Sequence, residues 1–394
     1  MRRNSKFKTQ PAKHEKLVPP LLAWFSCHAR DLPWRRTHDP YAIWVSEIML
    51  QQTQVKTVLP YWERWMRELP TIQSVAKASP AKLHKLWEGL GYYTRVRNLQ
   101  KAARQIIARH AGKFPMQYDD ILSLPGIGRY TAGAICSIAF DQPTPILDGN
   151  VIRVLTRIFG IATDPREKQT NSQLWQLAAS LVETAAAQTT SARPVARRKL
   201  LPLPGERAGV RANGKTISKK SCSFLNQSLM ELGALICSPR SPDCAACPAQ
   251  GLCVARKENL QDQLPNLGKR AAATERRFIA FVVERDGKFL VRQRPDGVVN
   301  AQLWEFPTDE FGWTDGCFKL SSTKPLCVIK HSITRYRITL EVWRAELENS
   351  RAKRDGRWLT LPRLHQLAFT SAHKKILANL GAGSTASART EVHY

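Results

Sequence analysis

The segment CSPRSPDCAACPAQGLC, residues 237–253, holds four cysteines with the spacing C-x6-C-x2-C-x5-C. Four thiolates this close together can enclose one metal centre, and nothing in the sequence points to secretion, where disulfides would compete. Zinc sites usually offer two C-x2-C pairs a dozen or more residues apart, whereas this segment has one such pair with a single cysteine on each side. The spacing favours one [4Fe-4S] cluster on Cys237, Cys244, Cys247 and Cys253, with zinc as the alternative.

The composition indicates a globular protein with a polyanionic partner. The 394 residues are 43% apolar, enough for two or three domains, and the net charge is +28. Residues 1–16 and 187–221 carry +5 and +8 of that charge, so the remainder is basic as well. No apolar run reaches the ~18 residues of a membrane span, and the N-terminus lacks the apolar core of a secretion signal. We therefore expect a soluble, cytoplasmic protein without a membrane partner.

The periodicity of apolar residues divides the chain into two parts. Up to about residue 186 apolar residues recur at three and four positions, which predicts helices at 41–53, 79–88, 96–109, 132–139 and 173–186. A further helix is expected at 224–236. The period then changes to two, which predicts strands at 278–284, 288–293, 327–331 and 336–343, with a closing helix at 374–380.

This pattern predicts an all-helical half followed by a smaller α+β half. Residues 187–221 hold Pro, Gly and Arg without a period, so they are expected to form a flexible insertion. The expected segments are a basic tail (1–16), a helical domain (17–236) that contains the insertion, the cysteine loop (237–253), a linker (254–273), an α+β domain (274–380) and a second tail (381–394).

A glycine turn, LPGIG at residues 124–128, joins two of the expected helices. Glycine lets the backbone approach a phosphate closely, and the N-terminus of the following helix supplies N–H donors. Such a turn would hold DNA without reading its sequence. A turn of this kind is also common as a plain connection between helices. The basic charge and the metal site favour the DNA-binding interpretation.

Two carboxylates are candidates for catalysis. Asp148 comes just before an expected helix, where it is either an N-cap or an exposed, reactive carboxylate. Glu47 lies on the first expected helix and has the apolar neighbours Ile43, Trp44 and Leu50 at three and four positions. Most helical glutamates are solvated, but an apolar setting raises the pKa of a carboxyl group and suits a general acid.

Five motifs together resemble the MutY family of adenine DNA glycosylases, in the helix-hairpin-helix endonuclease III superfamily. They are SEIMLQQT (46–53), GLGYY (89–93), LPGIGRYTA (124–132), LDGNV (147–151) and NQSLMELG (226–233). The resemblance covers about residues 20–380. It implies an all-α helix-hairpin-helix glycosylase half with an iron–sulfur loop, followed by a C-terminal α+β Nudix-like domain. The insertion departs from the family, although a longer loop costs little closure entropy.

The resemblance implies a monofunctional glycosylase of base excision repair that flips adenine out of a duplex and hydrolyses its glycosidic bond. Glu47 would protonate the adenine at N7, and Asp148 would stabilise the oxocarbenium-like sugar, as in a retaining glycosidase. Tyr130 and Asn150 would support these carboxylates by hydrogen bonding. The substrate would be double-stranded DNA with adenine opposite 8-oxoguanine or guanine, and the enzyme would act as a monomer.

The same resemblance implies a set of DNA contacts. Gly126 and Gly128 of the hairpin would hold a phosphate. Gln52 and Tyr92 match family positions that enter the DNA stack near the lesion, where an aromatic wedge offsets unstacking, and Thr53 belongs to the same set.

The C-terminal domain is expected to read the lesion. Its segment LWEFP, residues 303–307, resembles the family's Nudix-like domain, and no Glu-rich helix of a working Nudix hydrolase is found. The family's reader loop runs His-x-Phe-Ser-His, whereas this chain has HSITR at 331–335. His331 is kept and Thr334 keeps the hydroxyl, but Ile333 loses the aromatic ring and Arg335 replaces a histidine. The chain therefore departs from the family at two side chains of the loop that is expected to discriminate 8-oxoguanine.

Two other functions are alternatives. An endonuclease III-like glycosylase and lyase needs a lysine after the hairpin for a Schiff base, and Tyr130 holds that position here. A non-catalytic DNA-binding relative would not need both Glu47 and Asp148.

Overall fold

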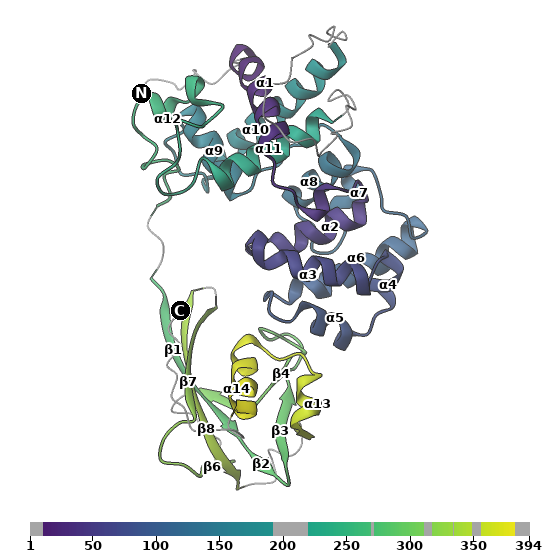
Figure 1. The fold of residues 1–394 in the computed structure, drawn as a ribbon, viewed down its shortest axis with the longest axis vertical. Coiled ribbons are helices and arrows are strands. Elements are labelled where there is room, and N and C mark those ends of the chain that lie inside the picture. The colour runs from purple at the N-terminus through teal and green to yellow at the C-terminus, as the bar shows by residue number, and fades with distance from the viewer. Residues whose placement is uncertain are drawn as a thin grey trace, which may run out of the picture. The chain divides into compact units, whose positions relative to one another are not determined.

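The structure is a computed structural model that describes residues 11–191, 220–268, 272–310, 317–333, 335–348 and 356–382 (Figure 1). Contacts between Cα atoms group the chain into two compact units. The first comprises residues 1–51 and 108–269, and the second comprises residues 52–107 and 270–394. Most of the expected insertion, residues 192–219, lies outside the described residues, as does Thr334.

The described residues of the first unit form helices and no strand. Asp39 caps α2, with its Oδ1 accepting from the Tyr41 N–H at 3.0 Å, and Pro40 occupies the first turn. Gly160, with φ = +68°, ends α9 in the left-handed conformation that favours glycine. The helices are α1 (Pro11–His28), α2 (Pro40–Leu50), α7 (Tyr118–Leu122), α8 (Arg129–Phe140), α9 (Gly149–Phe159), α10 (Lys168–Ser191), α11 (Ser221–Leu235) and α12 (Val254–Lys257), with 3-10 turns at Pro33–Arg35 and Gln250–Leu252.

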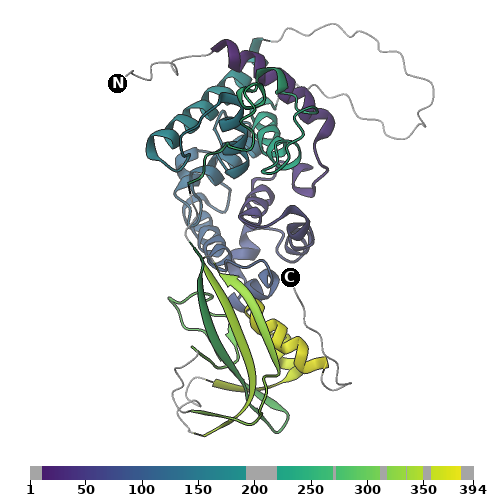
Figure 2. The same ribbon diagram turned by 90° about the vertical axis from the view of Figure 1, so that its left-hand side faces the viewer.

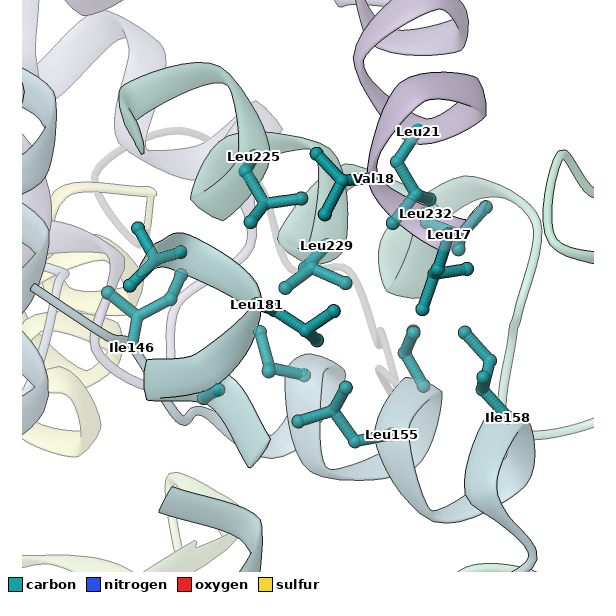
Figure 3. Packing of buried hydrophobic residues seen from close by; sticks show 14 of the residues in the cluster. Leu17, Val18, Leu21, Ile146, Leu155, Ile158, Leu181, Leu225, Leu229 and Leu232 are labelled. Carbon is teal, nitrogen blue, oxygen red and sulfur yellow. The ribbon is translucent and has the colours of Figure 1, made fainter. Parts of the chain in front are cut away.

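One hydrophobic core joins α1, α9, α10 and α11 (Figure 3). The α11 leucines recur at four and three positions, so they share one face of that helix. Burying each such side chain stabilises the fold by about 1.5–3 kcal/mol. The labelled members of this core are Leu17, Val18, Leu21, Ile146, Leu155, Ile158, Leu181, Leu225, Leu229 and Leu232.

Helix α1 begins earlier than the sequence predicted. We expected a basic tail through residue 16, but the helix already starts at Pro11. Lys13 donates to the Ile158 carbonyl at 2.9 Å, and the buried Leu17 and Val18 anchor the following turn. These contacts extend the helix into a segment that charge alone marked as a tail.

Four helices belong to the second unit or reach into it: α3 (Val55–Glu68), α4 (Ile72–Lys77), α5 (Pro80–Trp87) and α6 (Thr94–His110). Thr71 and Ser79 cap α4 and α5 with their hydroxyl groups. The rings of Trp65 and Trp87 meet edge to face at 5.6 Å and are fully buried. None of the helices in the described ranges is long and apolar enough to cross a membrane.

The C-terminal part of the second unit contains two sheets. In the first, β1 runs parallel to β8 and antiparallel to β5, while β7 and β6 pair with β8 (Figure 2). In the second, β3 pairs with β2, β4 and β9. The strands are β1 (Thr274–Val282), β2 (Glu284–Arg285), β3 (Lys288–Gln293), β4 (Trp304–Glu305), β5 (Thr308–Glu310), β6 (Phe318–Leu320), β7 (Cys327–Ile333), β8 (Tyr336–Leu347) and β9 (Gly356–Thr360), followed by the helices α13 (Leu361–His365) and α14 (Ser371–Ala382).

Alternate residues of β1 belong to different apolar clusters. Ala280 and Val282 pack with α14 residues such as Ile376, whereas Ile279 and Phe281 belong to a separate cluster. This alternation is the period of two that predicted the strand. The predicted all-helical half and α+β half are thus confirmed.

Candidate active site and cysteine loop

The hairpin between α7 and α8 presents backbone donors. Gly126 has φ = +79°, which favours glycine. Gly128 is the N-cap of α8 without a side-chain capping bond, and a Cβ built on it would meet no atom within 4 Å. The first N–H groups of a helix have no intrahelical acceptor. This geometry suits a phosphate oxygen that accepts from the backbone.

Glu47 is buried and bonded to Tyr130. It lies on α2 with 5% of its surface exposed, and the Tyr130 hydroxyl donates to its Oε2 at 3.0 Å. Burial raises the pKa of Glu47 to about 7; the Tyr130 hydrogen bond opposes this rise and the charge of Asp148 adds to it. A carboxyl group with this pKa is about half protonated at neutral pH, as suits a general acid.

Asp148 is the N-cap of α9 and also holds Asn150. Its Oδ1 accepts from the Val151 N–H at 2.8 Å, and its Oδ2 accepts from Asn150 Nδ2 at 3.0 Å. Burial raises the pKa of Asp148, although these hydrogen bonds oppose the rise. Capping therefore occupies one oxygen and leaves the other to Asn150. Asp148 can therefore be the N-cap of α9 and a reactive carboxylate at the same time.

Arg153, which belongs to none of the sequence motifs, connects Asn150 with the cysteine loop. Its Nη2 donates to Asn150 Oδ1 at 2.8 Å and to the Gly233 carbonyl at 2.7 Å. Its Nε donates to the Cys237 carbonyl at 2.7 Å. The spacing of three between Asn150 and Arg153 on one helix was a usable signal. No sequence pattern indicated the bond to the Cys237 carbonyl, which lies 84 residues further along the chain.

All four cysteines of the loop line one cavity, together with apolar side chains such as Val154, Ile158 and Leu232. Arg157 donates to the Cys237 sulfur at 3.4 Å and to the Ser238 carbonyl at 2.7 Å. All nine cysteines of the chain lie in the described residues, and none of them forms a disulfide there. Across those residues no three His, Cys, Asp or Glu side chains gather closely enough to hold a single metal ion.

A second buried carboxylate, Glu231, has a different environment from Glu47. Arg30 and Arg35 donate to its Oε2 at 2.7 and 2.9 Å. Burial opposes ionisation, but these two hydrogen bonds bring the pKa of Glu231 to about 2, so it stays ionised. The positive charge of Arg35 also slightly opposes the rise that burial produces in the pKa of Glu47. No sequence pattern indicated that Arg30 and Arg35 both bond to Glu231.

The expected base-stack residues lie in the second unit. Gln52 and Tyr92 have φ of +55° and +46°, which is uncommon for residues other than glycine. Tyr92 exposes 47% of its surface, and the Arg95 guanidinium lies 5.6 Å from its ring centroid. Arg95 also contacts Thr53 Oγ1 at 3.5 Å. An exposed ring on a constrained backbone suits insertion between bases.

In the expected reader loop, residues 331–333 are the last residues of β7, and Arg335 directly precedes β8. His331 is half-buried on β7, and burial, together with the charge of Lys375, lowers its pKa. Arg335 is exposed and donates to the Tyr336 hydroxyl at 3.0 Å. Because Thr334 is outside the described residues, its expected contact stays a prediction.

Comparisons with known proteins agree with the sequence resemblance. Residues 45–180 match the model of the HhH-GPD superfamily of base excision DNA repair proteins, and residues 279–379 match the NUDIX domain model. The chain is 33% identical to the adenine DNA glycosylase of Homo sapiens over 90% of its own length and 72% of that protein. It is 35% identical to the adenine DNA glycosylase of Buchnera aphidicola subsp. Schizaphis graminum (strain Sg), over 73% of each chain.

A solved structure agrees as well. A thermostable thymine-DNA glycosylase matches with a TM-score of 0.50 and 27% identity, covering 63% of this chain and 98% of that one. The two family models confirm the expected helix-hairpin-helix and Nudix-like domains. By the identity and coverage of its relatives, the chain belongs to the adenine DNA glycosylase family.

Proposed function

We propose that this protein hydrolyses the N-glycosidic bond of adenine in duplex DNA, where the adenine lies opposite 8-oxoguanine or guanine. This proposal rests on the buried Glu47, whose pKa is raised to about 7 and whose carboxyl group accepts a hydrogen bond from Tyr130 and is influenced by the charge of Asp148. Family membership gives the substrate class, and these residues give the chemistry.

Glu47 acts as the general acid. Its neutral form protonates the flipped adenine at N7, which makes the base a better leaving group. Tyr130 donates to Oε2, so the transferable proton resides on Oε1. Because burial raises the pKa of Tyr130 well above its ordinary value, the phenol stays a donor throughout.

Asp148 acts on the sugar that the adenine leaves behind. Its carboxylate stabilises the oxocarbenium-like cation electrostatically or by a transient bond, and Asn150 orients it. Water then adds to the sugar carbon and gives an abasic site. Tyr130 occupies the position of a lyase lysine and its phenol forms no imine, so the product strand stays intact.

The cysteine loop is proposed to hold one [4Fe-4S] cluster. Four thiols line one cavity with apolar walls, and the Arg157 guanidinium faces the Cys237 sulfur, which suits an anionic thiolate. When bound, the cluster supplies a redox-capable centre that fixes the loop, with no open ligand position. Protein prepared without oxygen should contain about four irons per chain, whereas stoichiometric zinc without iron would contradict this assignment.

The DNA is proposed to bind through backbone and stacking contacts. The hairpin at Gly126 and Gly128 holds a phosphate, and Tyr92 enters the stack. The C-terminal domain reads the opposite base at His331, Thr334 and Arg335. The high net positive charge of the protein favours binding to DNA whatever its base sequence.

The test is adenine release from an adenine:8-oxoguanine duplex under multiple-turnover conditions. The expected product is an abasic strand that breaks only after alkali. Glu47→Gln should reduce single-turnover release by at least ~100-fold with duplex binding retained. A covalent adduct trapped with borohydride in high yield would instead favour the lyase, and binding without any adenine release would favour a non-catalytic relative.

A further inference from the structure

Glu88 joins the helices of the second unit to the C-terminal domain of the same unit. It directly follows α5 and exposes 7% of its surface. Its Oε1 accepts from the Phe369 backbone N–H at 3.0 Å. Its Oε2 accepts from the ammonium groups of Lys85 and Lys374 at 2.9 and 3.1 Å. One buried carboxylate therefore holds groups from both parts of the unit.

Glu88 is ionised in this position. Burial raises its pKa, but the hydrogen bonds from Lys85 and Phe369 outweigh burial and hold the pKa below the ordinary range. A buried charge is costly when it loses its partners, so separating the two parts at this point is unfavourable. Lys85 adds a direct bond to the Leu367 carbonyl at 2.9 Å.

The segment that Glu88 holds belongs to the core of the C-terminal domain. Phe369 is fully buried, and its ring stacks on Phe306 with centroids 5.9 Å apart. The neighbouring Ala368 carbonyl accepts from the Trp304 N–H at 2.9 Å. Glu88 therefore contacts a rigid part of that domain, and movement of the domain acts on Glu88 directly.

On its other side, Glu88 leads into the turn that carries Tyr92. Gly89 has φ = +109°, and a Cβ there would lie 2.2 Å from the Tyr61 hydroxyl oxygen. That hydroxyl donates to the Glu88 carbonyl at 2.8 Å, and Trp87 Nε1 donates to the Gly91 carbonyl at 3.1 Å. Because neighbouring groups bond both ends of the turn, it has little room to adjust independently of Glu88.

A second connection follows the turn. Arg97, on α6, donates to the Ala301 carbonyl of the C-terminal domain at 3.0 Å. Glu88 and Arg97 thus flank Tyr92 in sequence, and each is bonded to that domain. One attachment on each side of this short turn restricts its rotation more than a single attachment would.

We propose that Glu88 is a positioning residue that couples the C-terminal domain to the Gly89–Tyr92 turn. Docking of that domain sets the position of the Tyr92 ring. When the C-terminal domain contacts the base opposite adenine, its change in position is transmitted through Glu88 to Tyr92, which enters the base stack where the duplex is opened. In its effect on DNA this inference rests on the proposed function. The coupling itself is a property of the protein without DNA.

The first experiment measures amide hydrogen exchange in the full-length protein without DNA. Glu88→Gln keeps an acceptor for Phe369 but removes the charge, and Lys374→Met removes the partner on α14. Both variants should speed exchange at residues 367–377 and also at 89–93 by about 5-fold or more, the lower end of typical coupling between sites. The double variant should add little to either single change.

Glu68→Gln is the matched control, because Glu68 is a more exposed carboxylate of the same unit, paired with Lys82 at 3.6 Å. It should leave exchange in both segments unchanged. The coupling is overturned if Lys374→Met, whose side chain is half exposed and easily replaced, speeds exchange at 367–377 while the turn stays as protected as before.

The second experiment compares adenine release from adenine:8-oxoguanine and adenine:guanine duplexes at saturating enzyme. Glu88→Gln and Lys374→Met should reduce the preference for 8-oxoguanine by about 5-fold, with release from adenine:guanine unchanged. An unchanged preference in both variants would overturn the coupling. Wild-type protein that releases no adenine would contradict the proposed function instead, and the exchange experiment would still decide the coupling.

Discussion

Arg153 is bonded at the same time to Asn150 and to the backbone of Cys237, at 2.8 and 2.7 Å. Asn150 in turn donates to Asp148, so one planar guanidinium connects the candidate catalytic carboxylate with the first cysteine of the loop. A displacement of the loop is therefore transmitted to Asp148 through three successive hydrogen bonds. Loading of the cluster and positioning of the carboxylate are expected to depend on each other.

Arg153→Met should lower single-turnover adenine release by about 10- to 100-fold, the usual size of losing a group that orients a site residue. Arg153→Lys should restore little, because an ammonium group cannot reproduce the planar geometry of both bonds. Iron content and release rate are measured on the same preparations. Arg166→Met, which removes an exposed guanidinium bonded to Asp164, serves as the control. Full activity of Arg153→Met with normal iron would show that the connection is dispensable.

The pH dependence of adenine release should follow Glu47. Because the protonated form is the acid and its pKa is about 7, the rate should fall as the pH rises through 7, approaching tenfold per unit. The rate should also fall in acid, where Asp148 becomes protonated. The profile is measured by single-turnover release between pH 5 and 9. Glu47→Gln should retain no fall above pH 7; a wild-type rate that is flat from pH 6 to 9 would exclude Glu47 as the acid.

The same carboxyl group should affect stability in a defined direction. Its pKa is higher in the folded protein than the ordinary value of 4.5, so the unfolded chain releases this proton first. Glu47 therefore destabilises the fold increasingly as the pH rises from 4.5 to 7, by on the order of 3 kcal/mol at about 1.4 kcal/mol per pKa unit. Urea unfolding should find Glu47→Gln more stable than the wild type at pH 8, with a smaller difference at pH 5.

The sequence predicted those features that depend on neighbouring residues. The strand at Lys288–Gln293 has the predicted bounds, because its alternation is local. The apolar neighbours of Glu47 correctly indicated that it is buried. In contrast, the contact between Glu88 and Phe369 joins residues 281 positions apart, and no local pattern encodes it. The positive φ of Tyr92 likewise follows from tertiary packing, since tyrosine has no preference for that conformation.

Asp148→Asn separates capping from catalysis. Asparagine caps a helix about as well as aspartate, so the loss in stability should stay below about 1 kcal/mol. If the negative charge stabilises the cation, release should nevertheless fall by at least ~100-fold. Thermal unfolding and single-turnover release are measured together. A near-normal rate would reduce Asp148 to a helix cap.

Arg335→Ala tests whether the guanidinium in the reader loop contacts a phosphate or a base. Arg335 is exposed, and its bond to the Tyr336 hydroxyl holds the guanidinium beside the Tyr336 ring. A phosphate contact carries no sequence information, so its loss should weaken binding to adenine:8-oxoguanine and adenine:guanine duplexes equally. The salt dependence of log K should flatten by about one unit of slope.

Thr334→Ala is the contrasting variant. A hydroxyl that bonds the edge of the oxidised guanine is worth about 1–3 kcal/mol of discrimination, so its loss should reduce the preference for 8-oxoguanine by roughly tenfold without changing the salt slope. Binding of an uncleavable adenine analogue opposite each guanine, measured across salt, distinguishes the two effects. If Arg335→Ala weakens only the 8-oxoguanine duplex and leaves the slope unchanged, the guanidinium reads the base. In that case the arginine has taken over the reading role of the histidine it replaces.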